Sequence, residues 1–352
     1  MNNQHQRRWQ PLLQQWVIIA AKSQARPWSG QSVGEKAAAV PRHDPDCYLC
    51  PGVTRASGHT NPTYQGAWAF ENDFASLIPD NRTTATRVDA PIIGSTDSLN
   101  LTAPASGRCR VLCWSADHSK TLADLSLKEM QSVVELWQEE FTALKSDAEI
   151  QHILIFENKG EEVGVSNRHP HGQIYAMGFV SDTGLRMRQA QSAYAENNAQ
   201  ASLLQDLINR PEYQSELLIE QTEYFKTVVP FAARFPYESW IVPRRHVGSI
   251  DGLTAAELEN LAGVYQRQAQ RYDSLFRRSS PNVTLLHNAP CDDNATNTHW
   301  CFHIALQPPL RDSSTLKYLA GFESGANNVI NPVQPELAAE ALRQCNINRD
   351  VA

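Results

Sequence analysis

Hydrophobic residues return with a helical period along residues 126–145. Apolar side chains recur there every three or four positions, which places them on one face of a helix. This face consists of Met130, Val133, Val134, Trp137 and Phe141. Ser126 precedes Glu129 by three residues, the spacing of a capping box in which each side chain bonds the backbone N–H of the other residue. The pattern predicts a helix that begins after Ser126.

Signals of the same kind predict the other elements. Thr254, followed three residues later by Glu257, predicts the start of a second long helix over residues 254–276. Runs rich in β-branched and aromatic residues predict strands within residues 66–77, 110–116, 149–158 and 169–177, and again within 234–246, 282–288 and 298–306. A loop is predicted over residues 26–46, polar helices that bridge the two halves over 181–218, and a terminal helix over 336–344.

The order of these elements repeats along the chain with matched spacings. The landmarks are His118, Ser126, Asn158 and His169 in the first half, and His246, Thr254, Asn288 and His299 in the second. The first histidine precedes the helix cap by eight residues in both halves, and the asparagine precedes the second histidine by eleven in both. Such a match predicts an internal duplication. We expect two halves of one αβ fold that share a sheet or pack as equivalents.

Composition and charge narrow the class of protein. The chain has 352 residues, of which 41% are hydrophobic and 20% charged, which excludes a disordered or fibrous class. A net charge of −7 with interspersed signs disfavours a nucleic-acid partner. No apolar run approaches the ~20 residues that span a bilayer. Seven cysteines, an odd number, and a start without an apolar signal indicate a cytoplasmic protein with reduced thiols.

The stretch GEEVGVSNRHPHGQIYAM, residues 160–177, concentrates candidate chemistry. As a strand, its second part would place His169, His171, Gln173 and Tyr175 on one face. The loop before it has glycines, a serine and an asparagine whose N–H and hydroxyl groups can cradle a phosphate. A neutral imidazole can attack phosphorus and form a phospho-histidine. An isolated histidine is more often a core or surface residue, but the cluster after a Gly-rich loop favours a catalytic role.

A second constellation is DPDCYLCPG, in which Cys47 and Cys50 have the spacing of a zinc knuckle. A tetrahedral site needs two more ligands, for which His118 and His169 are the candidates. Cysteine pairs with this spacing are also found by coincidence or as redox pairs. The other five cysteines show no comparable pattern and are expected to pack in the interior.

Six segments together resemble one known family. HDPDCYLCPG, FENDFASL, DHSKTL, FENKG, GVSNRHPHGQ and LLHNAP with THWCFHIALQPPLR are similar to galactose-1-phosphate uridylyltransferase, a branch of the histidine-triad superfamily, in order from about residue 8 to about 323. The resemblance implies an α+β fold: a duplicated histidine-triad-like αβ unit with an extended, mainly antiparallel sheet flanked by helices. Residues 1–180 would carry the zinc site and HPHGQ, and residues 181–352 would bind the sugar phosphate.

The resemblance also implies a reaction by double displacement. His171 would attack the α-phosphorus of UDP-glucose and expel glucose 1-phosphate, and galactose 1-phosphate would then take the uridylyl group. Gln173 would hydrogen-bond the phosphoryl oxygens. The nucleotide and phosphate contacts would be Arg26, Asn72, Asp73, Asn158, Gly164 and Ser166, with Arg168 beside the phosphate. Lys317, Phe322 and Glu323 match the sugar site, and Cys47, Cys50, His118 and His169 match the ligands of one structural zinc ion.

The chain departs from the family pattern in three places. Some relatives bind a second metal through one glutamate and three histidines; here Met187 and Ala305 replace two ligands, His287 and His303 remain, and we expect no second metal. Arg168 stands where proline is usual. In the sugar segment Phe322 replaces tyrosine, Val329 replaces glutamine, and INPVQPE resembles the ADP-sugar phosphorylase and archaeal branches.

These departures keep other functions open. A nucleotide-sugar phosphorylase or hydrolase, or a transferase with an ADP-sugar donor or another sugar phosphate, is the alternative among enzymes. A zinc-stabilised nucleotide sensor would need neither His171 nor Gln173, and a zinc protein that binds nucleic acid would not be acidic. Relatives are dimers, so a homodimer is implied in which Lys317 and Glu323 serve the neighbouring subunit. Glu157, at the end of its strand, is expected to face solvent or a partner.

Overall fold

One large antiparallel sheet organises the molecule. The computed structural model describes residues 5–20, 40–79, 99–100, 102–165 and 167–347. Nine strands follow one another in the order β3, β4, β6, β5, β10, β11, β9, β8 and β7. Their bounds are Trp68–Glu71, Gly107–Cys113, His171–Met177, His152–Lys159, Asn282–His287, His303–Gln307, Ser239–Pro243, Phe225–Val228 and Leu218–Gln221. A smaller sheet joins β1 (Gln6–Gln10), β2 (Gln15–Ile19) and β12 (Ile330–Asn331).

The two halves meet at the centre of the large sheet, where β5 pairs with β10. On one side of this seam the strand order is β5, β6, β4, and on the other it is β10, β11, β9. Along the chain the two sets follow the same order. A long helix connects β4 to β5 in the first half and β9 to β10 in the second, and β6 and β11 come last. All pairings in this sheet are antiparallel. The predicted α+β class with a shared antiparallel sheet is confirmed, whereas the division at residues 180 and 181 stays a prediction.

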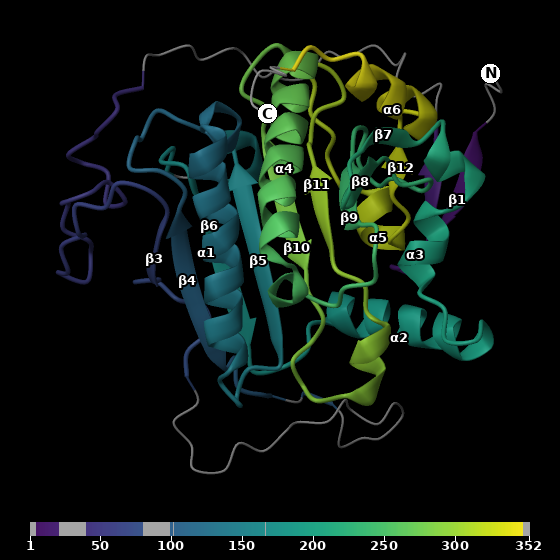
Figure 1. Cartoon of the computed structure of the whole chain (residues 1–352), viewed down its shortest axis with the longest axis horizontal. Helices are drawn as coiled ribbons and strands as arrows, with labels where there is room; N and C mark the ends of the chain where they lie inside the picture. Colours follow the sequence, from purple (N-terminus) through teal and green to yellow (C-terminus); the bar gives the residue numbers. More distant parts are fainter. Residues whose placement is uncertain (1–4, 21–39, 80–98, 101, 166, 348–352) are drawn as a thin grey trace.

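Helices α1 (Leu127–Lys145) and α4 (Ala255–Phe276) lie side by side on one face of this sheet (Figure 1). Both begin with the predicted capping box: Ser126 Oγ and Thr254 Oγ1 each accept the backbone N–H three residues later at 3.3 Å. Each glutamate carboxylate in turn accepts the N–H of its cap residue at 2.7 Å. The helix starts predicted from the sequence are therefore confirmed.

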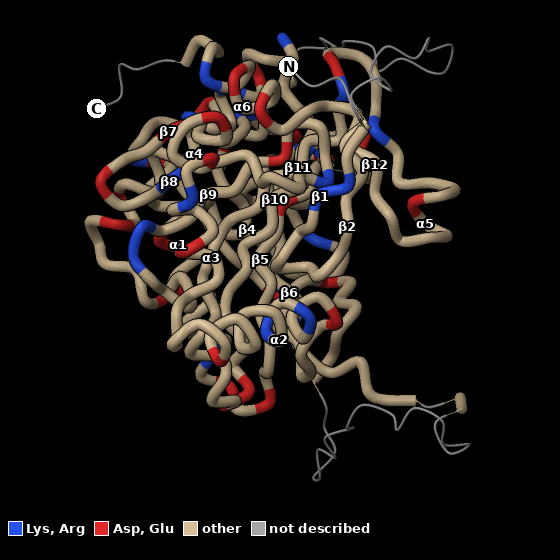
Figure 2. The backbone as a smooth tube through the Cα atoms, turned by 90° about the vertical axis from the view of Figure 1, so that its right-hand side faces the viewer, with Lys and Arg blue, Asp and Glu red and all other residues tan. Residues whose placement is uncertain are grey.

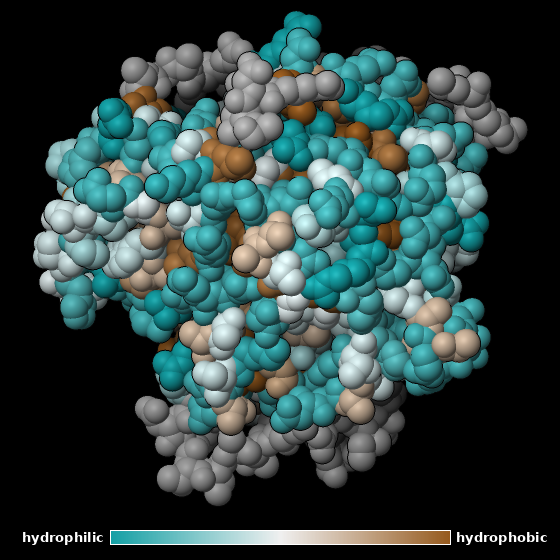
Figure 3. Space-filling model, in the orientation of Figure 1, coloured by the Kyte–Doolittle hydropathy of each residue, from teal (hydrophilic) through white to brown (hydrophobic). Residues whose placement is uncertain are grey.

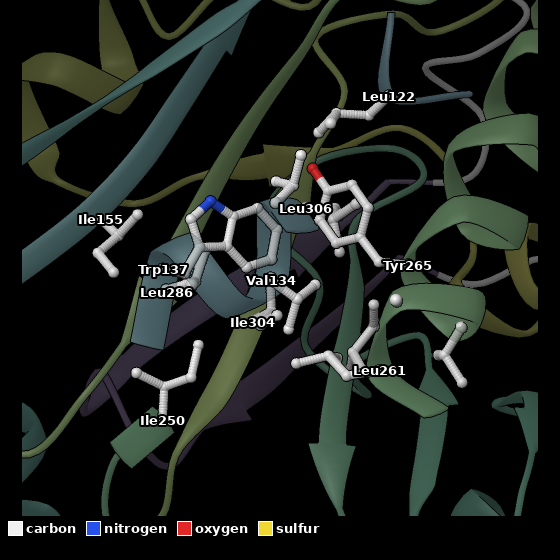
Figure 4. Close-up of a cluster of buried hydrophobic side chains, with 14 of the residues drawn as sticks. Leu122, Val134, Trp137, Ile155, Ile250, Leu261, Tyr265, Leu286, Ile304 and Leu306 are labelled. Carbon is white, nitrogen blue, oxygen red and sulfur yellow. The ribbon is translucent and has the colours of Figure 1, made fainter. Parts of the chain in front are cut away.

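The core lies between these two helices and the sheet (Figure 4). Trp137 of α1 contacts Tyr265 of α4 edge to face, with ring centroids 5.5 Å apart. Near Trp137 lie Ile155 from the first half and Leu286 from the second, both buried. Since burial of one such side chain stabilises by about 1.5–3 kcal/mol, this core ties the halves together.

Shorter helices cover the opposite face of the second half. They are α2 (Asp182–Asn197) and α3 (Leu203–Ile208), and both contribute to an apolar cluster with residues of β9 and β11. The bridge predicted to be helical over residues 181–218 is interrupted, because Ala199 and Gln200 have positive φ angles of 52° and 64° that end a right-handed helix. Helix α5 (Phe322–Ala326) and the terminal helix α6 (Pro335–Arg343) follow β11.

The surface is mainly polar. The face in Figure 3 is largely hydrophilic, with small scattered apolar areas, and Figure 2 shows basic and acidic residues interspersed over the chain. Among the described helices, none combines the length and apolar character that a bilayer crossing requires. Most of the loop predicted over residues 26–46 lies outside the described residues.

Candidate active site and metal cluster

Two cysteines and two histidines from three segments converge at one point. Cys47 and Cys50 lie in the loop before β3, His118 follows β4, and His169 precedes β6. All four are buried, and their ligand atoms lie within 4.8 Å of one another. Cys50 Sγ is 3.5 Å from Nδ1 of both histidines. Zn–S and Zn–N bonds of ~2.3 and ~2.1 Å at a tetrahedral angle give about this separation. The donor set fits a structural zinc ion.

Neighbouring groups fix the orientation of the cluster residues. Nε2 of His169 lies 2.9 Å from the carbonyl oxygen of Ser115 and 2.9 Å from the hydroxyl of Tyr64. A carbonyl oxygen only accepts, so Nε2 carries the proton and Nδ1 keeps its lone pair for a cation. Asn167 donates to Cys47 Sγ at 3.3 Å and accepts the backbone N–H of His169 at 2.9 Å. These contacts hold the start of β6 against the metal cluster.

His171 is the first residue of β6. Its Nδ1 lies 2.7 Å from the carbonyl oxygen of His169. Because this oxygen accepts the Nδ1 proton, the neutral ring keeps its lone pair on Nε2. Desolvation by burial lowers the pKa of His171, while the bond to the His169 carbonyl opposes that shift. A neutral imidazole with a free lone pair on Nε2 is the form that can act as a nucleophile.

The predicted alternation along HPHGQ is present from His171 onward. His171, Gln173 and Tyr175 are half-buried on one face, and the residues between them are buried toward α1. His169 lies before the strand, where its side chain joins the metal cluster. A Cβ atom on Gly172 would collide with the ring of buried Trp114 and lie 2.7 Å from the Phe156 carbonyl oxygen. Only glycine fits between these groups.

A cavity of about 660 Å³ opens beside His171, where β5 ends and β6 begins. Its wall includes Asn158, Gly160 and the basic residues Lys120, Lys159, Arg168 and Arg278. Each of these cations is held by a carboxylate: Lys120 by Glu129 at 2.8 Å, Lys159 by Asp273 at 3.2 Å, Arg168 by Glu161 at 2.8 Å and Arg278 by Glu162 at 2.5 Å. Lysine and arginine side chains can donate charge-assisted hydrogen bonds to a phosphate, and here the carboxylates fix their positions.

The sequence did not single out Lys120 and Arg278 as cavity residues. Lys120 lies in DHSKTL, which marked the family but not a role for its lysine. Arg278 follows the end of α4, in a part of the chain without a motif. Its position depends on the pairing of β5 with β10, which spacing along the chain does not reveal.

Glu157 corrects an expectation. We predicted that it faces solvent or a partner, but its side chain is buried on the helix side of β5. It accepts hydrogen bonds from Trp114 Nε1 at 3.1 Å and from the Tyr265 hydroxyl at 3.3 Å. Desolvation raises the pKa of this carboxyl. Glu157 also reaches the cavity wall, where it joins α4 to β4 beneath the candidate site.

Only some of the predicted binding residues that the structure describes line the cavity beside His171. Among the described residues that line the cavity, Asn158 and Arg168 are present, whereas Asn72, Asp73, Gly164 and Gln173 are not. Asn72 caps its own turn by accepting the N–H of Phe74 at 2.9 Å, and Asp73 pairs with Arg55 at 3.2 Å. Gly164 has a φ of 85° and ends the short turn after Gly160. Arg26 and Ser166 lie outside the described residues.

The predicted sugar residues lie near this cavity. Lys317 and Glu323 form a buried ion pair, and Glu323 also accepts the N–H of Ile330 at 2.8 Å. Desolvation lowers the pKa of Lys317. Phe322 is 53% exposed. Leu316 and Tyr318, on either side of Lys317, line the same cavity as His171.

Comparison with known proteins identifies the family. Sequence models of galactose-1-phosphate uridyl transferase match residues 1–181 with the N-terminal domain and residues 187–350 with the C-terminal domain. The galactose-1-phosphate uridylyltransferase of Haemophilus influenzae is 36% identical over 338 residues, which cover 96% of this chain and 93% of that protein. The chain belongs to the galactose-1-phosphate uridylyltransferase family. The Rattus norvegicus protein of the same name is 37% identical, with 97% of this chain and 88% of that protein covered.

Solved structures share the fold of this uridylyltransferase family member. An ADP-glucose phosphorylase from Arabidopsis thaliana with bound ADP-glucose superposes with a TM-score of 0.78 at 22% identity, covering 98% of this chain and 100% of that one. A uridylyltransferase structure superposes with a TM-score of 0.73, also at 22% identity, covering 97% of both chains.

The four positions that bind a second metal in some uridylyltransferases carry a different set of residues in this chain. The rings of His287 and His303 stack with centroids 4.7 Å apart. Met187 and Ala305, at the other two positions, belong to an apolar cluster. Burial lowers the pKa of both histidines, to about 4 for His303. Two imidazoles beside apolar side chains do not make a four-ligand site, and the expected lack of a second metal stays a prediction.

Proposed function

We propose that the protein is a UDP-glucose–hexose-1-phosphate uridylyltransferase, which converts UDP-glucose and galactose 1-phosphate into glucose 1-phosphate and UDP-galactose. Family membership supports the substrates. The 2.7 Å hydrogen bond from His171 Nδ1 to the His169 carbonyl carries the mechanism, because it leaves Nε2 as the nucleophilic nitrogen at the cavity wall.

In the first step Nε2 of His171 attacks the α-phosphorus of UDP-glucose. The P–N bond forms as the bond between this phosphorus and the bridging oxygen breaks, and glucose 1-phosphate leaves with the electron pair. Gln173 lies two residues further along the same face of β6, where its amide can donate to the phosphoryl oxygens. Asn158 and Arg168 are the binding residues on the cavity wall.

In the second step a phosphate oxygen of galactose 1-phosphate attacks the same phosphorus. The P–N bond breaks, UDP-galactose forms, and His171 returns to its starting state without a net change in protons. Lys317, Phe322 and Glu323 are proposed to bind the hexose, and Arg26, Asn72, Asp73, Gly164 and Ser166 the nucleotide. The nucleotide assignment rests on the family pattern alone, and the hexose assignment rests also on the position of Leu316 and Tyr318 on the cavity wall.

The metal would have a structural role. Cys47, Cys50, His118 and His169 would hold one zinc ion, which supplies a rigid tetrahedral link between the loop and the sheet. His169 is joined to this cluster by its side chain and to His171 by its carbonyl oxygen. The cluster would therefore orient His171 through the backbone carbonyl of His169. A cytoplasmic homodimer completes the proposal, supported by the family resemblance and by the cysteine content.

Isotope exchange tests the double displacement. An enzyme of this type moves labelled glucose 1-phosphate into UDP-glucose without galactose 1-phosphate, because the first step is reversible alone. We expect exchange by the wild type, none by His171→Ala, and normal exchange by His246→Ala, whose ring lies at the surface and bonds the Thr298 carbonyl at 3.0 Å. Exchange that survives in His171→Ala would refute the role of this histidine.

A further inference from the structure

The Gly-rich loop next to His171 carries two carboxylates. Glu161 and Glu162 lie between Gly160 and Gly164, in the segment proposed to receive the phosphates. An uncompensated carboxylate at this place would repel a phosphate. Glu162 turns away from solvent, with a side chain only 8% exposed, and pairs at 2.5 Å with Arg278, whose side chain is 17% exposed. The pair joins a loop of the first half to the second half of the chain.

A second contact reaches the loop from the same segment of the second half. Gly160 has a φ of +101°, and a Cβ atom placed on it would lie 2.7 Å from Cβ of Pro281. The backbone of the loop thus rests directly on Pro281. The next residue, Asn282, pairs with Lys159 at the end of β5. Three successive contacts therefore place the loop against residues 278–282.

The contacts that hold His171 are separate from these. Its ring is oriented by the His169 carbonyl, and His169 is held by the metal cluster. Neither Glu162 nor Arg278 takes part in these contacts.

We propose that the ion pair between Glu162 and Arg278 is an inter-half latch that positions residues 160–165 to receive the phosphates of the sugar nucleotide. The inference rests on the proposed function and adds two positioning residues to it. Loss of Arg278 would release the loop and leave the Glu162 charge uncompensated near the phosphates, which costs more than loss of both partners. The latch thus governs binding of the donor and leaves the chemical step unchanged.

Steady-state kinetics separate the latch from a merely structural contact. For Arg278→Gln we expect KM for UDP-glucose to rise about tenfold, or about 1.4 kcal/mol, with kcat within twofold of the wild type. Arg278→Lys keeps the charge and should stay within about threefold. The double variant Glu162→Gln with Arg278→Gln should bind better than Arg278→Gln alone, since the stranded carboxylate is gone. Arg277→Gln, at the exposed neighbouring position, is the control and should match the wild type.

Amide hydrogen exchange gives a readout that does not need turnover. We expect faster exchange for residues 160–165 in ligand-free Arg278→Gln, with β5 and β6 unchanged. An unchanged KM in Arg278→Gln would overturn the latch, as would a fall in kcat at constant KM. If Arg278→Gln does not fold, the double variant decides: it lacks the ion pair, so KM for UDP-glucose should exceed that of the wild type with faster exchange in residues 160–165, and wild-type values of both would overturn the latch.

Binding of UMP, measured by calorimetry, distinguishes the latch from the proposed function. If the wild type shows no uridylyl exchange but binds UMP, and Arg278→Gln weakens that binding about tenfold, the latch stands and the proposed reaction falls. If the wild type turns over and both KM and UMP affinity are unchanged in Arg278→Gln, the latch falls alone. A wild type that neither turns over nor binds UMP overturns both.

Discussion

Gly172 lies where the catalytic strand passes the ring of Trp114, and its lack of a side chain is a packing requirement. We expect Gly172→Ala to lower the free energy of unfolding by about 2–3 kcal/mol, because the methyl group meets a buried ring and a backbone carbonyl. Chemical denaturation measures this change. Gly66→Ala, which meets no atom within 4 Å, is the control and should be nearly neutral. Equal stability of the two variants would contradict the packing argument.

At the residue scale, local motifs single out candidate site residues, whereas the surroundings of a residue depend on distant parts of the chain. The HPHGQ segment and the Cys47–Cys50 pair could be found because their residue types and spacings are local. The burial of Glu157 could not be predicted, because its hydrogen-bond partners Trp114 and Tyr265 lie 43 and 108 residues away in the sequence. A carboxylate is normally exposed, and only these distant donors reverse that expectation.

At the scale of elements, the N-terminus of α4 combines a capping box with an ion pair. The carboxylate of Glu257 accepts from Arg245 at 2.5 and 2.7 Å and from the Thr254 N–H at 2.7 Å. The bond to Arg245 is the main cause that lowers the pKa of Glu257 to about 2. A depressed carboxyl pKa stabilises the folded state above the ordinary pKa near 4.5, and this contribution is lost as the pH falls toward 2.

We therefore expect Glu257→Gln to cost about 1–2 kcal/mol of unfolding free energy at pH 7. The difference from the wild type should shrink as the pH falls below about 4.5, where the unfolded-state carboxyl takes up a proton. Urea unfolding at a series of pH values measures it. Glu259→Gln, at an exposed position of the same helix, is the control and should leave the unfolding free energy at pH 7 nearly unchanged. If the difference in unfolding free energy between Glu257→Gln and the wild type stayed constant down to pH 3, the role of the Glu257 charge would be contradicted.

Elements with local signals were the ones that could be predicted. Both long helices begin at their predicted caps, because a capping box involves only four consecutive residues. The bridge over residues 181–218 was less well predicted. Its polar composition indicates a helix throughout. The break occurs at Ala199 and Gln200 because both have positive φ angles, and neither alanine nor glutamine is a residue type that predicts such angles.

At the scale of the whole molecule, the metal cluster links the loop around Cys47 and Cys50 to the strand that carries His171. We expect Cys50→Ser to lose bound zinc, lower the melting temperature by about 5 °C or more, and slow uridylylation at least about tenfold. Elemental analysis and calorimetry measure the first two effects. Cys345→Ser, whose thiol donates to the Ala341 carbonyl and lies outside the metal cluster, is the control. Full activity in a zinc-free Cys50→Ser protein would contradict the positioning role.

The duplicated architecture could be predicted from spacing, but the active cavity could not. Matched landmarks imply two similar units, and the shared sheet follows from burying both on one core. The seam between β5 and β10 brings Arg278 to the loop of residues 160–165, although 116 residues separate it from Glu162. Contacts across such a seam depend on which distant strands pair, and a local motif does not specify the pairing of strands that lie far apart in the chain.

The most direct test of the account is the mass of the protein after brief reaction with UDP-glucose and a basic quench, which preserves phospho-histidine. We predict one added UMP group per chain in the wild type, none in His171→Ala and none when ADP-glucose replaces UDP-glucose. An AMP adduct would instead place the protein with the ADP-sugar enzymes. A wild type that gains no nucleotide from either donor while transferring uridylyl groups would contradict the covalent mechanism.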